Sequence, residues 1–158
     1  GLLTSAVDVS DRFINRGQIV STRGRAPGQS LSYSAGRPTR TWHMPMVVMI
    51  DNDSASASEI VAACLSDHNR AIIVGQTSYG KGEVQSIYPL ATIGAGLRLT
   101  TARFFSPNGR ALSKRGVTPH VTVSQRNSSP RARFNPEIPA DLQLQEALSI
   151  ARTQLVRR

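Results

Sequence analysis

The chain has 158 residues, the usual size of one domain, and 39% of them are hydrophobic, which is enough for a core. It contains no run of about 18 apolar residues, so a transmembrane helix is excluded, and its single cysteine, Cys64, excludes an internal disulfide and a cysteine-rich zinc site. The net charge is +9, but aromatic residues make up 5% and no nucleic-acid-binding module is recognisable, so we expect a solvated basic surface and no nucleic-acid partner.

The first part of the chain indicates a helix and then a strand. Apolar residues recur at helical spacing over residues 2–16, and Gly17 is a natural helix stop. Residues 18–22 are typical of a short strand. Residues 24–41 are rich in Gly, Pro, Ser and Arg and indicate a surface loop or an irregular hairpin.

The centre of the chain predicts a strand, a turn and a helix within residues 46–67. Residues 46–50 form a near-continuous apolar run, typical of a strand buried on both faces. Residues 54–59 include types favoured at helix N-termini, and the apolar positions that follow share one helical face. Residues 71–74 predict a second buried strand.

The remainder predicts mainly strands, followed by a last helix. Further strands are expected over residues 84–88, 97–103 and 117–123. Pro89 is expected to close the first of these, because proline cannot donate a hydrogen bond to a ladder. Apolar positions at helical spacing predict a helix over residues 141–156.

The first candidate site is the run Ser54-Ala55-Ser56-Ala57-Ser58-Glu59. A serine at the N-terminus of a helix faces unpaired N–H groups and the positive end of the helix dipole. If such a serine attacked a carbonyl, the N–H of the next residue could hold the oxyanion. Serine is also a favoured N-cap, and taken alone the run fits that structural role better.

The second candidate site is Lys81 between Gly80 and Gly82, one of two lysines in the chain. A lysine in a partly apolar pocket can lose its proton near neutral pH and act as a general base. Taken alone, a flexible turn with a solvated lysine is the better interpretation. A magnesium-binding P-loop is disfavoured, because Gly82 stands where a Ser or Thr is required.

Together the two sites suggest a Ser/Lys pair, since a nucleophile and its base need only be adjacent in space. The three histidines, His43, His68 and His120, show no triad pattern, and no group of His, Asp or Glu has the spacing of a metal site.

Several separate motifs point in one direction: SASASEI (54–60), DHNRA (67–71), GQTSYGKG (75–82), VQ (84–85), LTTARFFSPNGR (99–110) and GVTP (116–119). In this order they resemble the C-terminal processing peptidases, or tail-specific proteases, which are Ser/Lys serine endopeptidases. The resemblance implies that Ser56 is the nucleophile and that Lys81, 25 residues later, is the general base. It implies that Gln85 orients the lysine.

The same resemblance implies the supporting parts of the site and no cofactor. The N–H of Ala57 matches one oxyanion donor, and Gly1 is the residue available to match the second. The positions of Asp67, Gly80 and Gly82 match supporting residues. The sequence departs from the family at Asp53, where a small or uncharged residue is usual.

The implied fold is α/β, a ClpP/crotonase-like core of buried strands alternating with helices. We expect residues 1–123 to be a partial protease catalytic domain, residues 124–140 a linker and residues 141–158 a C-terminal helix. The first strand of the family's catalytic domain and its PDZ domain are absent from this sequence, so we expect the isolated chain to depend on them for activity.

The implied function is hydrolysis of peptide bonds near substrate C-termini through an acyl-enzyme. For this Lys81 must be neutral, so we expect burial to lower its pKa. A crotonase-type acyl-CoA enzyme and a non-catalytic scaffold module remain the alternatives. Protein or peptide substrates, a homo-oligomer and a periplasmic or cell-envelope location complete the expectations.

Overall fold

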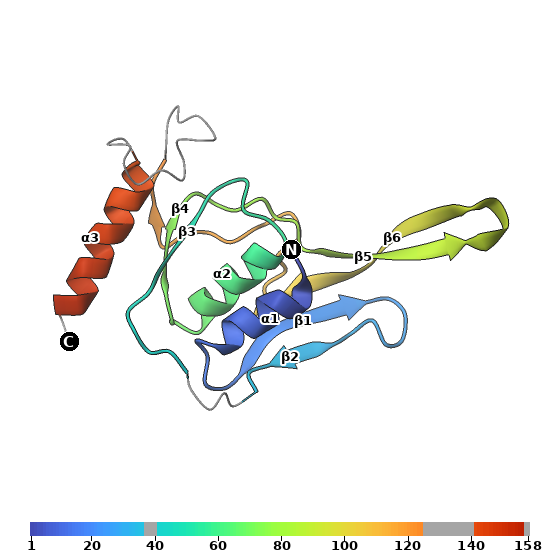
Figure 1. Ribbon diagram of the computed structural model, residues 1–158, viewed down its shortest axis with the longest axis horizontal. Helices are drawn as coiled ribbons and strands as arrows, with labels where there is room; N and C mark the ends of the chain where they lie inside the picture. Colours follow the sequence, from blue (N-terminus) through green and yellow to red (C-terminus); the bar gives the residue numbers. More distant parts are fainter. Residues whose placement is uncertain (37–40, 125–140, 157–158) are drawn as a thin grey trace.

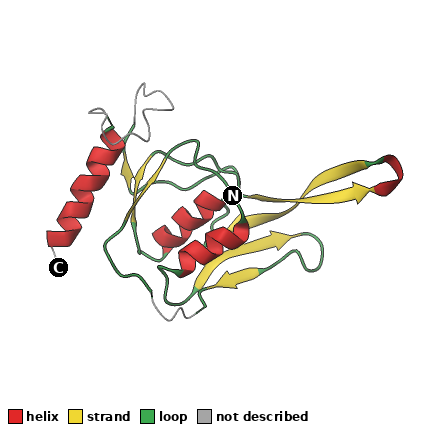
Figure 2. Ribbon diagram, in the orientation of Figure 1, coloured by secondary structure: helices red, strands yellow, loops and turns green. Residues whose placement is uncertain are grey.

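The computed structural model describes residues 1–36, 41–124 and 141–156, which form two β-sheets and three α-helices (Figures 1 and 2). The parallel sheet has the order β3-β4-β7, with β3 at Val47–Ile50, β4 at Ile72–Gly75 and β7 at Val121–Thr122. The antiparallel sheet has the order β2-β1-β6-β5, with bounds Gln18–Gly24 (β1), Ser32–Ser34 (β2), Glu83–Leu90 (β5) and Ala95–Phe105 (β6). The expected α/β fold is confirmed.

Helix α2 connects the two sheets, and the other two helices each pack on one of them. Helix α2 (Ala57–Asp67) contacts β1 of one sheet and β4 of the other, and α1 (Leu3–Asp11) packs against α2 and β1 (Figure 1). The third helix, α3 (Leu142–Val156), lies against β3 and β4. Within the described ranges, no helix is long and apolar enough to cross a membrane.

The core is apolar and lies around α2. Fully buried side chains reach it from β1, α2 and β4, among them Ile19, Ile60, Leu65 and Ile73. Each such side chain stabilises the fold by about 1.5–3 kcal/mol relative to an exposed one. This packing fixes the position of α2, and therefore of the residues at its two ends.

Helix α1 is shorter than its apolar spacing predicts, because it ends at Asp11 and not near residue 16. The last turn tightens, with Arg12 N–H donating to Val9 O at 3.2 Å and Phe13 N–H to Ser10 O at 3.0 Å. Ile14 is still buried in the core. The apolar spacing therefore continues beyond the helix because the following residues pack inward.

The expectation that Pro89 closes a strand is wrong, because β5 continues to Leu90 and Pro89 pairs with Gly96. Strand β5 is at the edge of its sheet, where a missing N–H costs little. The strand expected over residues 117–123 is also shortened, to the two residues of β7.

The expectation that the first parallel strand is buried on both faces is wrong as well, because Met49 is 46% exposed. The expected loop or irregular hairpin after β1 contains the short strand β2. The predicted linker over residues 124–140 lies outside the described residues, apart from Ser124.

A long hairpin leaves the body of the molecule. Strands β5 and β6 are joined by a 3-10 turn (Ala91–Ile93) and extend beyond the rest of the fold (Figure 1). Tyr88, Leu97 and Leu99 are exposed on this arm. We refer to residues 83–105 as the hairpin arm.

Candidate active site

The two candidate sites lie at the same edge of the parallel sheet. Strands β3 and β4 are parallel neighbours in which Ile50 pairs with Gly75, so the segments that follow them leave the sheet side by side. Ser56 ends the segment after β3, and Lys81 lies in the segment after β4. A hydrogen bond of 2.9 Å from Tyr79 N–H to Ser54 O joins the two segments directly.

Ser56 has a strained backbone at the N-terminus of α2. Its φ of 61° and ψ of −116° place it among the three non-glycine residues with positive φ in the described ranges. Such a conformation costs about 1–3 kcal/mol and persists only where the surroundings impose it. A strained strand-to-helix turn of this kind presents nucleophilic serines in other hydrolase folds.

The turn that leads to Ser56 is held by Asp51. Its Oδ1 accepts hydrogen bonds from the N–H of Asp53, the N–H of Ser54 and the hydroxyl of Ser54, each at 3.0 Å. A carboxylate that bonds the backbone two and three residues ahead stabilises a tight turn. The chain therefore enters α2 sharply, with the half-buried Ser56 at the bend.

The Glu59 carboxylate, 1% exposed, connects the two segments, a role not expected from the sequence. Its Oε2 accepts hydrogen bonds from the N–H of Ser56 and the N–H of Lys81, both at 2.8 Å. Its Oε1 accepts from the Ser78 hydroxyl at 2.6 Å and from the Gly80 N–H at 2.7 Å. The Ser-x-x-Glu spacing of a capping box was the available signal for the contact with Ser56.

Lys81 is exposed in this chain, so the partial burial that we expected is not supplied by the described residues. It lines a shallow pocket together with Asp53, Ala55, Tyr79, Gly80, Glu83 and Lys114. Lys114, for which no function was expected from the sequence, therefore shares the pocket with Lys81. Asp53, the departure from the family pattern, faces the same pocket.

Gly80 and Gly82 allow the lysine segment to pass close to the chain around residues 112–116. Gly80 has a φ of +87°, and its carbonyl accepts a hydrogen bond from Lys114 N–H at 2.8 Å. A Cβ on Gly82 would overlap the backbone of Leu112 and Ser113. Larger residues at these two positions would push Lys81 away from its present place.

Ala57 and Gly1 lie together beside Ser56. Ala57 is the first residue of α2, and a Cβ added to Gly1 would come within 2.9 Å of the Ala57 Cβ. The two residues named as sources of oxyanion donors are therefore neighbours. Gln85 is placed differently: it is exposed on β5, beside a register shift, and is not among the residues that line the pocket.

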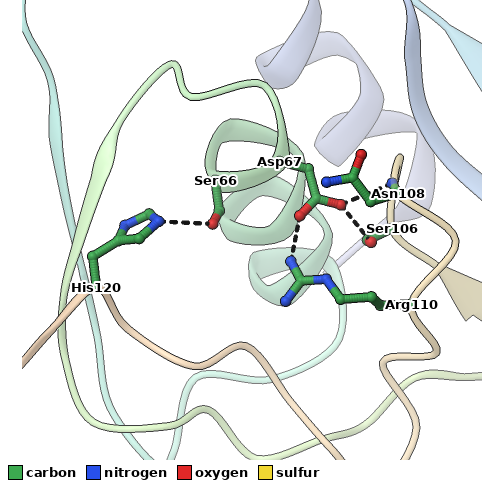
Figure 3. Close-up of polar contacts among 6 residues, drawn as sticks. All are labelled: Ser66, Asp67, Ser106, Asn108, Arg110 and His120. Carbon is green, nitrogen blue, oxygen red and sulfur yellow. Dashed lines mark hydrogen bonds and ion pairs between the residues drawn. The ribbon is translucent and has the colours of Figure 1, made fainter.

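Asp67 lies at the opposite end of α2 from Ser56, about 16 Å away for a helix of 11 residues. Figure 3 shows its carboxylate, 2% exposed, accepting from the Ser106 hydroxyl and the Asn108 N–H and pairing with Arg110. These contacts attach the turn after β6 to α2. The geometry gives Asp67 a structural role at a distance from the pocket.

Two of the histidines also make structural contacts. His120 Nδ1 accepts from the Ile73 N–H at 2.9 Å, and its Nε2 lies 3.3 Å from the Ser66 hydroxyl (Figure 3). His68 Nε2 lies 2.7 Å from Gln18 O. Among the described residues, no group of three or more His, Cys, Asp or Glu could hold a metal ion.

Cys64 is not a plausible nucleophile. Burial raises the pKa of its thiol to about 12, the Ser10 hydroxyl opposes this rise and the Asp67 carboxylate adds to it. A thiol must lose its proton to attack, so Cys64 is inert in the folded chain. Ser56 is thus the better-placed nucleophile of the two.

Known proteins resemble the chain in sequence and in fold. The model of peptidase family S41 matches residues 1–123. A carboxy-terminal-processing protease of Bartonella bacilliformis is 49% identical over 125 residues, which are 79% of this chain and 29% of that protein. A carboxyl-terminal-processing protease of Synechocystis is 37% identical over 152 residues, or 95% of this chain and 34% of that protein.

A solved structure extends the likeness to three dimensions. The photosystem II D1 C-terminal processing protease superposes with a TM-score of 0.71 and 33% identity, over 78% of this chain and 32% of that one. The chain spans about a third of the length of these two curated relatives.

Proposed function

The chain belongs to peptidase family S41, and from this premise we propose that it supplies the nucleophile and the base of a serine-type C-terminal processing peptidase. The observation that carries the proposal is the strained Ser56 at the N-terminus of α2, with Lys81 in the segment bonded beside it. The acyl-CoA enzyme and the scaffold module are not favoured by the relatives.

The proposed chemistry is a two-step acyl transfer. The Ser56 Oγ attacks the carbonyl carbon of the scissile peptide as its proton passes to the neutral Nζ of Lys81. The N–H of Ala57 donates to the developing oxyanion, with a second donor from the backbone at Gly1. When the C–N bond breaks, the Lys81 ammonium gives its proton to the leaving amine.

Hydrolysis of the acyl-enzyme repeats these steps with water. Lys81 takes a proton from water as the water oxygen attacks the ester carbon, and the Ser56 Oγ regains a proton when it leaves. No step requires a cofactor. Gln85 is proposed to orient Lys81, which requires the amide to turn towards the pocket when substrate binds.

The proposed substrates are unfolded protein tails and peptides, and the site is proposed to be completed by parts of the protein that precede this sequence. Those parts would include the first strand of the catalytic domain and a PDZ domain, in a protein that works in the periplasm or cell envelope. The exposed Lys81 supports this proposal, since a base lysine requires more cover than the described residues give.

The test compares two lysines of one pocket in the longest natural protein that contains this chain. Ser56→Ala and Lys81→Ala should each abolish cleavage of an unfolded substrate, and the double variant should be no worse, because the two residues act as a unit. Lys114→Ala is the matched control and should retain most activity. Activity in Lys81→Ala together with loss in Lys114→Ala would show that the base is assigned to the wrong lysine.

A further inference from the structure

We propose that Glu59 is a positioning residue that clamps the backbones of Ser56 and Lys81 to one carboxylate oxygen. The inference rests on the proposed function, because it explains how the nucleophile and the base keep a fixed separation. The N–H groups of both residues donate to the same Oε2 at 2.8 Å. Two segments that are far apart along the chain are therefore joined through one atom.

The second carboxylate oxygen fixes the clamp to the rest of the fold. Oε1 accepts from the Ser78 hydroxyl and from the Gly80 N–H. The Ser78 hydroxyl accepts in turn from the Val117 N–H at 2.7 Å. The Glu59 carboxylate thus has four donors on two segments of the chain, and the Ser78 hydroxyl connects it to a third segment at Val117.

The surroundings of Glu59 strengthen these hydrogen bonds. Glu59 is 1% exposed, so water does not compete for its oxygens. Hydrogen bonds to a carboxylate are roughly twice as strong as those between neutral groups. Glu59 also lies in the first turn of α2, where the helix dipole favours a negative charge.

The clamp explains why Ser56 keeps its strained backbone. Its N–H is directed into the Oε2 bond, and this orientation helps to hold φ at 61°. The same bond leaves the next N–H, that of Ala57, as the donor at this helix end for an oxyanion. Glu59 acts on the reaction through these backbones, because its buried carboxylate does not line the pocket.

Substitutions of Glu59 can distinguish a role in positioning the two backbones from a role in packing alone. A glutamine has the same shape but one acceptor oxygen and one NH2 group, so in Glu59→Gln two of the four N–H or O–H donors face another donor. An aspartate keeps both oxygens and the charge but is one methylene shorter. Glu59→Asp therefore cannot reach both segments at once.

The kinetic arm uses the longest natural protein that contains this chain. Glu59→Gln should lower kcat about 10- to 100-fold, the usual effect of a small misplacement of reacting groups, and leave KM unchanged. Glu59→Asp should also lower kcat, whereas Ser78→Ala, which keeps both Oε2 bonds, should lower it less. Asp141→Asn is the matched control, because Asp141 is a buried carboxylate that caps α3 by accepting from Leu144 N–H.

The second arm measures amide hydrogen exchange and does not depend on activity. Glu59→Gln and Glu59→Asp should speed exchange at the amides of Ser56 and Lys81, while Asp141→Asn leaves both unchanged. Unchanged exchange at these two amides in both Glu59 variants, or a kcat within twofold of wild type in both, would overturn the proposal.

The two arms also separate this inference from the proposed function. If Ser56→Ala remained as active as wild type, the assignment of the nucleophile would be wrong, and the exchange measurement alone would decide whether Glu59 clamps the two segments. If Glu59→Gln did not fold, Glu59→Asp would decide both arms, because it preserves the charge.

Discussion

At the scale of single residues, Ser56 is where the chemistry and the backbone make opposite demands. A left-handed φ favours glycine, but glycine has no hydroxyl. Glu59 and Asp51 supply hydrogen bonds that compensate for the strain, one on each side of the bend. The serine is thus maintained at a position where folding alone would favour another residue.

This conflict makes a prediction about stability. Ser56→Gly should unfold at a higher temperature than Ser56→Ala, with a free energy of unfolding greater by about 1 kcal/mol, because glycine adopts this backbone without strain. Both variants lack the hydroxyl, so the difference between their thermal melts measures the free-energy cost of the strained backbone. Both should be equally inactive. Equal melting temperatures would show that the turn is not strained.

At the scale of elements, α2 carries a buried carboxylate at each end, and each carboxylate bonds a different loop of the chain. Glu59 serves the first turn, and Asp67 holds the turn after β6 through Ser106, Asn108 and Arg110. The two carboxylates thus have different roles: Glu59 bonds the segments that carry Ser56 and Lys81, whereas Asp67 bonds a structural turn.

Asp67→Asn should therefore damage stability and not the chemistry. The asparagine amide has one acceptor oxygen, so it cannot accept both from Arg110, which bonds Oδ1, and from the Ser106 hydroxyl and Asn108 N–H, which bond Oδ2. We therefore expect the free energy of unfolding to fall by about 1–3 kcal/mol. Activity per folded molecule should be kept, with kcat measured well below the melting temperature. A large loss of kcat in a fully folded Asp67→Asn protein would return Asp67 to the active site.

Local patterns were sufficient to predict the elements that surround the site. The apolar run before residue 51 and the helix-favouring residues after it predict β3 and α2, and the next apolar run predicts β4. Parallel pairing then brings Ser56 and Lys81 to one edge. The ends of α1 and β5 were predicted less well, because packing of Ile14 and the edge position of Pro89 depend on tertiary contacts.

The contacts that organise the site could not be predicted from such patterns. Glu59 meets Lys81 across 22 positions, and Lys114 shares a pocket with Lys81 although 33 positions separate them. No periodicity marks these pairs. The burial expected for Lys81 failed for a related reason, since it assumed cover that the described residues do not provide.

At the scale of the whole molecule, burial of Cys64 makes the stability of the fold depend on pH. It is fully buried on α2 and belongs to the apolar core. Its thiol pKa is raised by burial from 9.0 to about 12, so only the unfolded chain ionises it between these values. Folding is therefore penalised progressively as the pH rises from about 9.

Chemical denaturation at two pH values measures this effect. Between about pH 8 and about pH 10.5, ionisation of Cys64 in the unfolded chain should lower the free energy of unfolding of wild type by about 2 kcal/mol. Cys64→Ala has no thiol and should not show this decrease. The difference between the two proteins at each pH removes the contribution of other titrating groups. A difference that stays constant across this range would mean that the thiol is accessible to solvent in the folded protein.

The hairpin arm begins two residues after Lys81, so its exposed tip and the lysine segment belong to one continuous stretch of chain. Where the arm starts, Glu83 pairs with Arg103 of β6, and the Ser113 hydroxyl donates a hydrogen bond of 2.9 Å to Glu83 Oε1. A molecule bound along the arm would therefore contact the strand that follows directly after Lys81.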